Sequence, residues 1–257
     1  MALGLFRELG DSVQDSLRAL GRYAIFGARL ASETPRALLR FRLVVEQVHN
    51  AGALSLVIIM LSGLFVGMVL GLQGFDLLER FGSEESLGSA AALGLLKELG
   101  PVITALLFAG RAGTALASEL GLMRATDQIS AIEMMAVDPV RRVVMPRFLG
   151  GIIAMPLLAA IFSMIGLFGA QLVGVQLMGV DQGQFWSQMR GAVEIGDVME
   201  GILKSAVFGV ACSLVAVYEG YHSVPTAEGV GRATTRTVVI SSVSVLLLDY
   251  MLTAVML

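Results

Sequence analysis

The sequence predicts an all-α integral membrane protein. We expect an N-terminal interfacial amphipathic helix, then five transmembrane helices with a short cytoplasmic helix between the second and the third. Hydrophobic residues make up 56% of the 257 residues and charged residues only 15%, a composition far more apolar than that of a soluble domain. The apolar residues also gather in long runs, and about 20 of them suffice to cross a bilayer. We therefore assign residues 1–50 to interfacial helices and residues 51–257 to a five-span domain.

The N-terminal region alternates apolar and charged residues. Over residues 3–30 an apolar side chain recurs every three or four positions, with arginine and aspartate largely between, as in an amphipathic helix. This stretch is too polar to span, so we expect it to lie in the bilayer interface. Pro35 ends it, and a second mixed stretch, residues 36–50, leads toward the membrane. Because no unbroken apolar run follows the first charged residues, we do not expect the N-terminal stretch to be a cleavable signal peptide.

Five apolar runs are long enough to span. They cover approximately residues 51–74, 90–118, 148–178, 201–217 and 238–257, with polar loops at 76–89 and 181–200. Gly63, Gly67 and Gly71 repeat at four-residue spacing in the first run, so they share one helix face and predict close approach of a neighbouring helix. Pro101 and Pro156 predict kinks in the second and third runs.

The arginines predict the orientation. If the N-terminus lies in the cytoplasm, 13 of the 18 basic residues fall in cytoplasmic segments. Cytoplasmic segments carry an excess of lysine and arginine, so we expect a cytoplasmic N-terminus and a C-terminus on the outer side. The cytoplasmic basic residues are Arg7, Arg18, Arg22, Arg29, Arg36, Arg40, Arg42, Arg124, Arg141, Arg142, Arg147, Arg232 and Arg236.

Motifs for catalysis are missing. Neither lysine, Lys97 or Lys204, lies in a phosphate-binding loop, so the chain is not expected to hydrolyse nucleotide by itself. His49 and His222 are far apart and Cys212 is the only cysteine, which predicts no metal site. There is no nucleophile elbow. The scattered basic residues do not suggest nucleic-acid binding. We therefore assign no catalytic residues and no metal ligands.

A few ionisable residues lie at membrane depth. They are Lys97, Glu98, Arg111, Lys204 and Asp249. A lone charge in hydrocarbon costs several kcal/mol, so such side chains face a cavity, pair with each other or reach an interface. Two interpretations follow. The charges either line a cavity for a polar headgroup that opens toward the outside, or they pair and fix the packing of the helices.

The segment between the second and third runs, residues 119–147, is short, amphipathic and rich in methionine. A helix over about 120–138 would end at Asp138, because Pro139 disfavours the α conformation before it. Such a helix between two spans suits docking into a groove on a partner. A plain interfacial helix is the alternative.

Three motifs resemble the MlaE/YrbE permease family. They are FVGMVLGLQGF at 65–75, the long run from Ala92 to Phe148 that includes EMMAVDP, and PTAEGVGRATTRTVV at 225–239. The resemblance extends over nearly the whole chain. The general Glu-Ala-Ala pattern of ABC permeases is absent, so the coupling helix is carried over by role, helped by EMMAVDP at Glu133–Pro139.

The resemblance implies the permease of an ABC transporter that moves phospholipids in the inner membrane of a Gram-negative bacterium and maintains the lipid asymmetry of the outer membrane. Implied partners are a second copy of the chain, an ABC ATPase subunit that holds ATP and magnesium, a STAS-domain subunit and a periplasmic hexamer of an MCE-domain protein. No cofactor is expected in this chain.

The resemblance also implies two sets of site residues. The segment around Ala125–Val137 becomes the coupling helix, with contacts to the ATPase from Arg124, Asp127, Gln128, Ile129, Ile132, Glu133, Met135 and Asp138. A phospholipid needs an apolar cavity for its chains and polar groups for its headgroup, and the outer ends of the first two spans offer both. The expected lipid-binding residues are Leu70, Leu72, Phe75, Leu77, Leu78, Phe81 and Leu99 for the chains, and Lys97 and Glu98 for the headgroup.

Other functions fit the same residues. One is an ATP-independent secondary transporter that uses Glu98 or Asp249 as a proton site. Another is a membrane scaffold for a periplasmic complex that transports nothing. A third keeps the ABC permease and changes the cargo to a sterol or another apolar lipid. Lipids and subunits that purify with the chain discriminate among them.

Overall fold

The computed structural model describes residues 14, 18, 21–34 and 41–256. Within these ranges the secondary structure is helical and there is no strand, which confirms the all-α class. Five helices in this part of the chain are long and apolar enough to cross a membrane, as predicted. They span Arg42–Glu79, Glu84–Ala125, Val140–Leu177, Ile195–Tyr221 and Ala227–Met256.

Several spanning helices contain 3-10 or π-helical turns. The first consists of α2 (Phe41–Gly52), η1 (Ala53–Ser55) and α3 (Leu56–Glu79). The second consists of η2 (Glu84–Ser86), α4 (Leu87–Leu93), η3 (Gly94–Leu99), α5 (Gly100–Phe108), η4 (Ala109–Gly113) and α6 (Thr114–Ala125). After α7 (Gln128–Met134), the third consists of η5 (Val140–Val144), α8 (Met145–Gln171) and η6 (Leu172–Leu177). The short α9 (Gln182–Ala192), then α10 (Ile195–Tyr221) and α11 (Ala227–Met256), complete the described fold.

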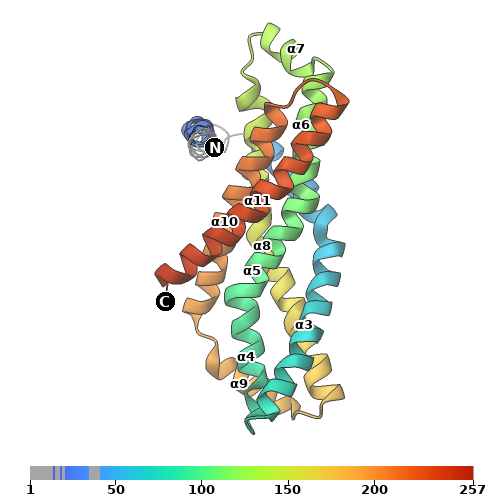
Figure 1. Ribbon diagram of the computed structural model, residues 1–257, viewed down its shortest axis with the longest axis vertical. Helices are drawn as coiled ribbons and strands as arrows, with labels where there is room; N and C mark the ends of the chain where they lie inside the picture. The colour runs from blue at the N-terminus through green and yellow to red at the C-terminus, as the bar shows by residue number, and fades with distance from the viewer. Residues whose placement is uncertain (1–13, 15–17, 19–20, 35–40, 257) are drawn as a thin grey trace, which may run out of the picture.

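The helices form an elongated bundle. Helix α7 lies at one end, and α4 and α9 lie at the other (Figure 1). Helix α8 packs against α3, α10 and α2. Phe108, Met155, Phe162 and Phe208 form the middle of the core where α5, α8 and α10 meet. A second cluster near α7 joins Phe26 and Leu30 of the N-terminal helix (residues 21–34) to Val144 and Phe148.

The glycine row of α3 lies against α8. A Cβ atom added to Gly67 would lie 1.9 Å from the carbonyl oxygen of Gly166, and one on Gly63 or Gly71 would come within 2.9 Å or 2.8 Å of an α8 carbonyl oxygen. Only glycine fits at such a distance. Close contact of two backbones maximises dispersion attraction, which drives helix association where surrounding lipid is equally apolar. The expectation that this face approaches a neighbour is confirmed.

Three boundaries differ from the sequence-based expectation. The helix of the first span runs unbroken from 42 through 79, across the division expected at residue 50. The loop expected at 76–89 is shorter in the structure, because one long helix ends at Glu79 and the next begins at Glu84. Much of the expected loop 181–200 is helical, because polar side chains cap the helices there. The Asp181 carboxylate accepts from the Gln184 N–H, and Glu194 and Asp197 form a reciprocal capping box.

Replacing Gly67 by leucine is expected to separate α3 from α8. The overpacked contact should cost about 1–3 kcal/mol or more, because backbone rather than a flexible side chain blocks the new Cβ. The melting temperature of the detergent-purified protein measures this. Gly110→Leu is the matched control, because nothing lies within 4 Å of a Cβ at that position. Equal melting temperatures for the two variants would contradict the account.

Candidate functional site

A buried polar cluster joins three spanning helices toward the α9 end of the bundle. Its centre is Lys204 of α10, whose side chain is 0% exposed. The Lys204 ammonium donates to Glu98 Oε1 at 2.9 Å, to the hydroxyl of Thr253 at 2.9 Å and to the backbone carbonyl of Lys97 at 3.1 Å. Thr253 in turn donates to Glu98 Oε2 at 3.3 Å. These contacts tie η3, α10 and α11 together.

Lys97 extends the polar cluster along α10. Its ammonium lies 2.9 Å from Glu200 Oε2 and 3.2 Å from Asp197 Oδ1. Glu200 also lies 3.7 Å from the Lys204 ammonium, so the two lysines share one carboxylate. Sequence reasoning placed Asp197 and Glu200 in an outer loop and missed them as partners. Glu200 lies four residues before Lys204, and Asp197 lies three residues before Glu200, so the three side chains share one helix face, which was the available signal.

Close backbone packing brings Lys204 to this place. A Cβ on Gly201 would lie 2.3 Å from the carbonyl oxygen of Leu96, so only a glycine lets α10 approach η3 so closely. Lys97 and Glu98 both lie in the π-helical turn η3, and such turns frequently occur at functional sites. Charge interactions also link Asp249 of α11 to Glu98 and Lys204. Asp249 Oδ1 is buried and has no hydrogen-bond partner in the described part of the chain.

The polar cluster supports both interpretations of the membrane-depth charges. Lys204 is enclosed and fully paired, which fits a role in helix packing. Glu98 is different, since its side chain is 40% exposed and still offers lone pairs to a ligand. The fifth charge, Arg111, lies elsewhere and donates to the carbonyl oxygen of Asn50 at 3.1 Å.

A cavity of about 850 Å³ lies at the end of α3, and its wall carries apolar side chains together with Gln73, Asp76, Glu79 and Arg80. Four residues of the expected lipid-binding set line it, together with Met178: Leu70, Leu72, Phe75 and Leu77. The others do not line it. Leu78 packs against the cluster around Phe185, Phe81 is exposed, and Leu99 packs against the main core. Lys97 and Glu98 do not line this cavity either. Within a single copy of the chain, the residues expected to bind the acyl chains and those expected to bind the headgroup therefore lie at separate places.

Helix α7 presents an exposed apolar surface at the opposite end. Met134 and Met135 are 84% and 67% exposed, and Val137 is also exposed. Ile132 and Met135 line a cavity of about 370 Å³ with Val137 and Arg142. The exposed apolar residues differ in two positions from those expected for docking. Ile129 is buried within this chain, and Met134, which was not expected to take part, is exposed. Asp127, Gln128 and Glu133 are exposed.

Two of the expected contact residues brace α7 instead of projecting from it. Arg124 donates to the carbonyl oxygen of Tyr221 at 2.7 Å and lies over its ring. Asp138 Oδ1 accepts from the Val140 N–H at 2.9 Å, and Oδ2 lies 3.2 Å from Arg29 of the N-terminal helix. These contacts fix both ends of the segment that carries α7.

The N-terminal helix strengthens that brace. Arg141 binds the Glu33 carboxylate with two nitrogens, at 2.9 and 3.0 Å. The Tyr23 hydroxyl donates to Glu219, which also lies 3.5 Å from Arg236. Burial and the hydrogen bond to Glu219 raise the pKa of Tyr23, so its hydroxyl stays protonated and keeps donating. Ion pairs and aromatic contacts with the N-terminal helix and α10 therefore hold the α7 segment in place.

Lys204→Met is expected to destabilise the fold. Removing one partner of a fully buried ion pair costs about 3–5 kcal/mol. Because Glu98 is 40% exposed and Glu200 keeps Lys97 as a partner, the cost here lies toward or below the lower end of that range. Arg232→Met is the control, since Arg232 and Glu228 are both about three-quarters exposed and such pairs contribute little. Thermal unfolding in detergent measures both. A Lys204→Met variant as stable as the control would show that the polar cluster does not hold the helices together.

Comparison with known proteins gives consistent results. The family described as "Permease MlaE" matches residues 44–255. The intermembrane phospholipid transport system permease protein MlaE of Haemophilus influenzae is 52% identical over 100% of this chain and 98% of its own length. A probable ABC transporter permease protein of Rickettsia bellii is 35% identical over 98% of each chain. The chloroplastic protein trigalactosyldiacylglycerol 1 of Arabidopsis thaliana is 30% identical over 84% of this chain and 62% of its own length.

The family match covers three of the five spanning helices whole, all but the first two residues of the first, and all but the last residue of the fifth. It also includes the polar cluster and the α7 segment. Since the most similar of these relatives aligns end to end, the shared architecture is that of the whole chain and not of one motif. This chain belongs to the MlaE permease family.

Proposed function

We propose that this chain is the permease of an ABC transporter that moves phospholipids between the bacterial inner membrane and periplasmic carriers, and so maintains outer-membrane lipid asymmetry. The observation that carries the proposal is the 52% identity, over the full chain, to a permease of an intermembrane phospholipid transport system. The five spanning helices and the two sites at opposite ends of the bundle support it.

In this proposal the α7 end faces the cytoplasm and the C-terminus lies on the periplasmic side. The chain is not an enzyme. A separate ABC ATPase subunit holds ATP and magnesium and docks on α7, where exposed Met134 and Met135 offer an adaptable apolar surface. The assembly contains two copies of the chain, a STAS-domain subunit and a periplasmic MCE-domain hexamer that receives or delivers lipid.

The phospholipid binds near the α9 end. Its acyl chains lie against the apolar side chains of the cavity, Leu70, Phe75 and Leu77, and its headgroup meets Glu98 and Lys97. The Lys97 ammonium has three donors and two carboxylate partners, so it can still donate to an oxygen of the lipid. Because a single chain separates these two parts, we place the complete pocket at the centre of the dimer.

The experiment that tests the proposal is purification of the intact complex from its native membrane, followed by mass spectrometry of its proteins and lipids. We expect an ABC ATPase and glycerophospholipid in stoichiometric amounts. Lipid without any ATPase would favour an ATP-independent transporter, and an ATPase with a sterol would change the cargo. A complex with neither would indicate a scaffold.

Charge reversal at Glu133 tests the docking role of α7. Glu133 is exposed, so Glu133→Lys should leave insertion and folding intact while it weakens ATPase association about tenfold. Co-purification of the ATPase and lipid-stimulated ATP turnover measure the effect. Glu85→Lys, also exposed but at the opposite end of the bundle, is the control. Undiminished co-purification in Glu133→Lys would remove this residue from the interface.

Photo-crosslinking tests the lipid pocket. Crosslinkers at Leu72 and Leu77, which are exposed and line the cavity, should capture phospholipid. Glu98→Gln should reduce transport without loss of assembly, because its amide oxygen still accepts from Lys204 while the carboxylate charge is lost. The readouts are lipid adducts by mass spectrometry and lipid transfer by the reconstituted complex. If crosslinkers deep in α11 capture lipid and those at Leu72 and Leu77 do not, the pocket is misplaced.

A further inference from the structure

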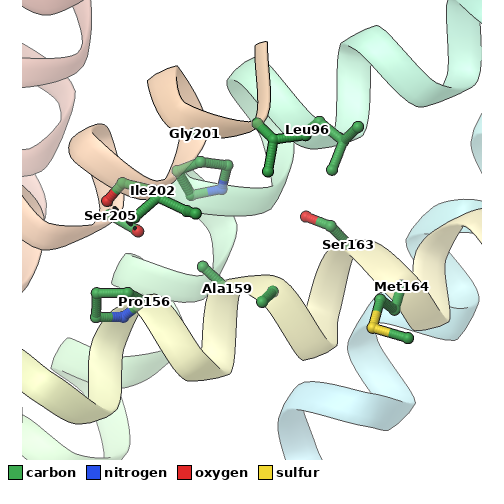
Figure 2. A pocket seen from close by; sticks show the side chains of 11 residues that line it. Leu96, Pro156, Ala159, Ser163, Met164, Gly201, Ile202 and Ser205 are labelled. Atoms are coloured by element: carbon green, nitrogen blue, oxygen red, sulfur yellow. Dashed lines mark hydrogen bonds between the residues drawn. The ribbon is translucent and has the colours of Figure 1, made fainter. Parts of the chain in front are cut away.

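A second cavity lies between α8, α10 and the start of α5, away from the cavity at the end of α3. Its volume is about 250 Å³. Figure 2 shows Leu96 on one side, Pro156, Ala159, Ser163 and Met164 along α8, and Gly201, Ile202 and Ser205 along α10. Nothing in the proposed transport function uses this cavity.

The cavity opens sideways into the membrane. Met164 and Ile202 on its two walls are 71% and 43% exposed, and Leu157, the neighbour of Pro156, is 55% exposed. All lie within spanning helices, so the medium outside is hydrocarbon. A void at such a place loses dispersion contacts on every lining atom until an apolar group fills it.

Water does not suit this cavity. A buried water molecule needs two to four polar partners, and the two hydroxyls that line the wall are already used inside the protein. Ser163 donates to the carbonyl oxygen of Leu95 at 3.3 Å, and Ser205 donates to that of Ile202 at 2.8 Å. The remaining lining residues are apolar or glycine. An apolar group therefore suits this cavity better than water does.

Size and depth restrict that occupant. A pocket that encloses a whole drug-sized ligand measures roughly 300–1,000 Å³, so 250 Å³ holds only part of a two-chain lipid. On α10 the lining ends at Ser205, which is about 15 Å from the start of the helix at 1.5 Å per residue. That is about half of a hydrocarbon core of roughly 30 Å, so the cavity lies in the leaflet at the α9 end.

Polar groups lie beside the lining residues at that end. Lys97 follows Leu96, and Asp197 and Glu200 adjoin Val198 and Gly201. The Lys97 side chain is 33% exposed and retains one donor beyond its two carboxylate contacts. Ester and phosphate oxygens of a glycerophospholipid accept such a hydrogen bond, whereas a purely apolar molecule does not.

We propose that this cavity is a lipid site that holds one acyl chain of a glycerophospholipid from the leaflet at the α9 end, with the polar end of that lipid beside Lys97. The lipid fills the seam between α8 and α10 from the membrane side. The polar end of this site shares Lys97 with the headgroup site of the proposed function and rests on it to that extent, whereas the acyl-chain cavity itself has no residue in common with that site.

The experiment uses the intact complex in dodecyl maltoside, with palmitoyl lysophosphatidylethanolamine as a single-chain probe. Ala160 lines the cavity and is exposed, so Ala160→Phe should fill it without a clash in the core. Native mass spectrometry should find one fewer bound probe molecule per chain in Ala160→Phe than in wild type. Leu157→Phe, an exposed position outside the lining, should keep the wild-type number. The same number in all three proteins would overturn the proposal.

A second measurement keeps the test valid if Ala160→Phe does not fold. A photo-crosslinker at Ile202 should capture the probe saturably, whereas one at Val210, exposed on the same helix beyond the cavity, should capture it only in proportion to its concentration. Equal, non-saturable capture at both positions would contradict a specific site. Capture of a polypeptide at Ile202 would show that a partner helix, not a lipid, covers the cavity.

Discussion

The charge of Lys204, enclosed among spanning helices, constrains much of this structure. An ammonium group with no exposed surface needs acceptors on every side, and they come from η3, from α10 itself and from α11. Three helices therefore hold one arrangement. The glycines allow it, since Gly201 lets α10 reach the backbone of η3 and the row at Gly63, Gly67 and Gly71 fixes α3 against α8. Close backbone contact and a paired buried charge thus act together where lipid provides no hydrophobic drive between helices.

The polar cluster and the α7 segment lie at different depths of the bundle, and continuous helices connect them. Helix α10 runs from the capping box at Glu194, past Lys204, to Tyr221, which receives Arg124 at the end of α6. The N-terminal helix is tied to the same region through Tyr23, Arg29 and Glu33. A displacement of α7 by a partner is therefore passed to rigid elements. In the proposed function, this arrangement connects the docking segment to the polar cluster.

Much of the fold followed from the sequence because it depends on local pattern. Apolar runs predicted the five spans, and the four-residue glycine spacing predicted a close neighbour for the first span, which the structure identifies as α8. Pairing across helices did not follow. That Lys204 meets Glu98, or that Asp197 and Glu200 hold Lys97, depends on helix placement and not on spacing within one segment. Capping side chains extended helices into segments that read as polar loops. Ile129 and Met134 show the same limit, since which of two apolar side chains turns inward is decided by tertiary packing. The predicted roles of the lipid-binding and coupling residues stay predictions.

The central claim is ATP-driven movement of phospholipid by this permease, and reconstitution tests it most directly. The complex is placed in liposomes that contain a fluorescent phospholipid, and transfer to a soluble acceptor or from a loaded donor is followed with and without ATP. The account predicts transfer that requires ATP and is lost when the ATPase cannot hydrolyse it. Transfer that proceeds equally without ATP, or no phospholipid transfer by a fully assembled complex that hydrolyses ATP, would contradict the account.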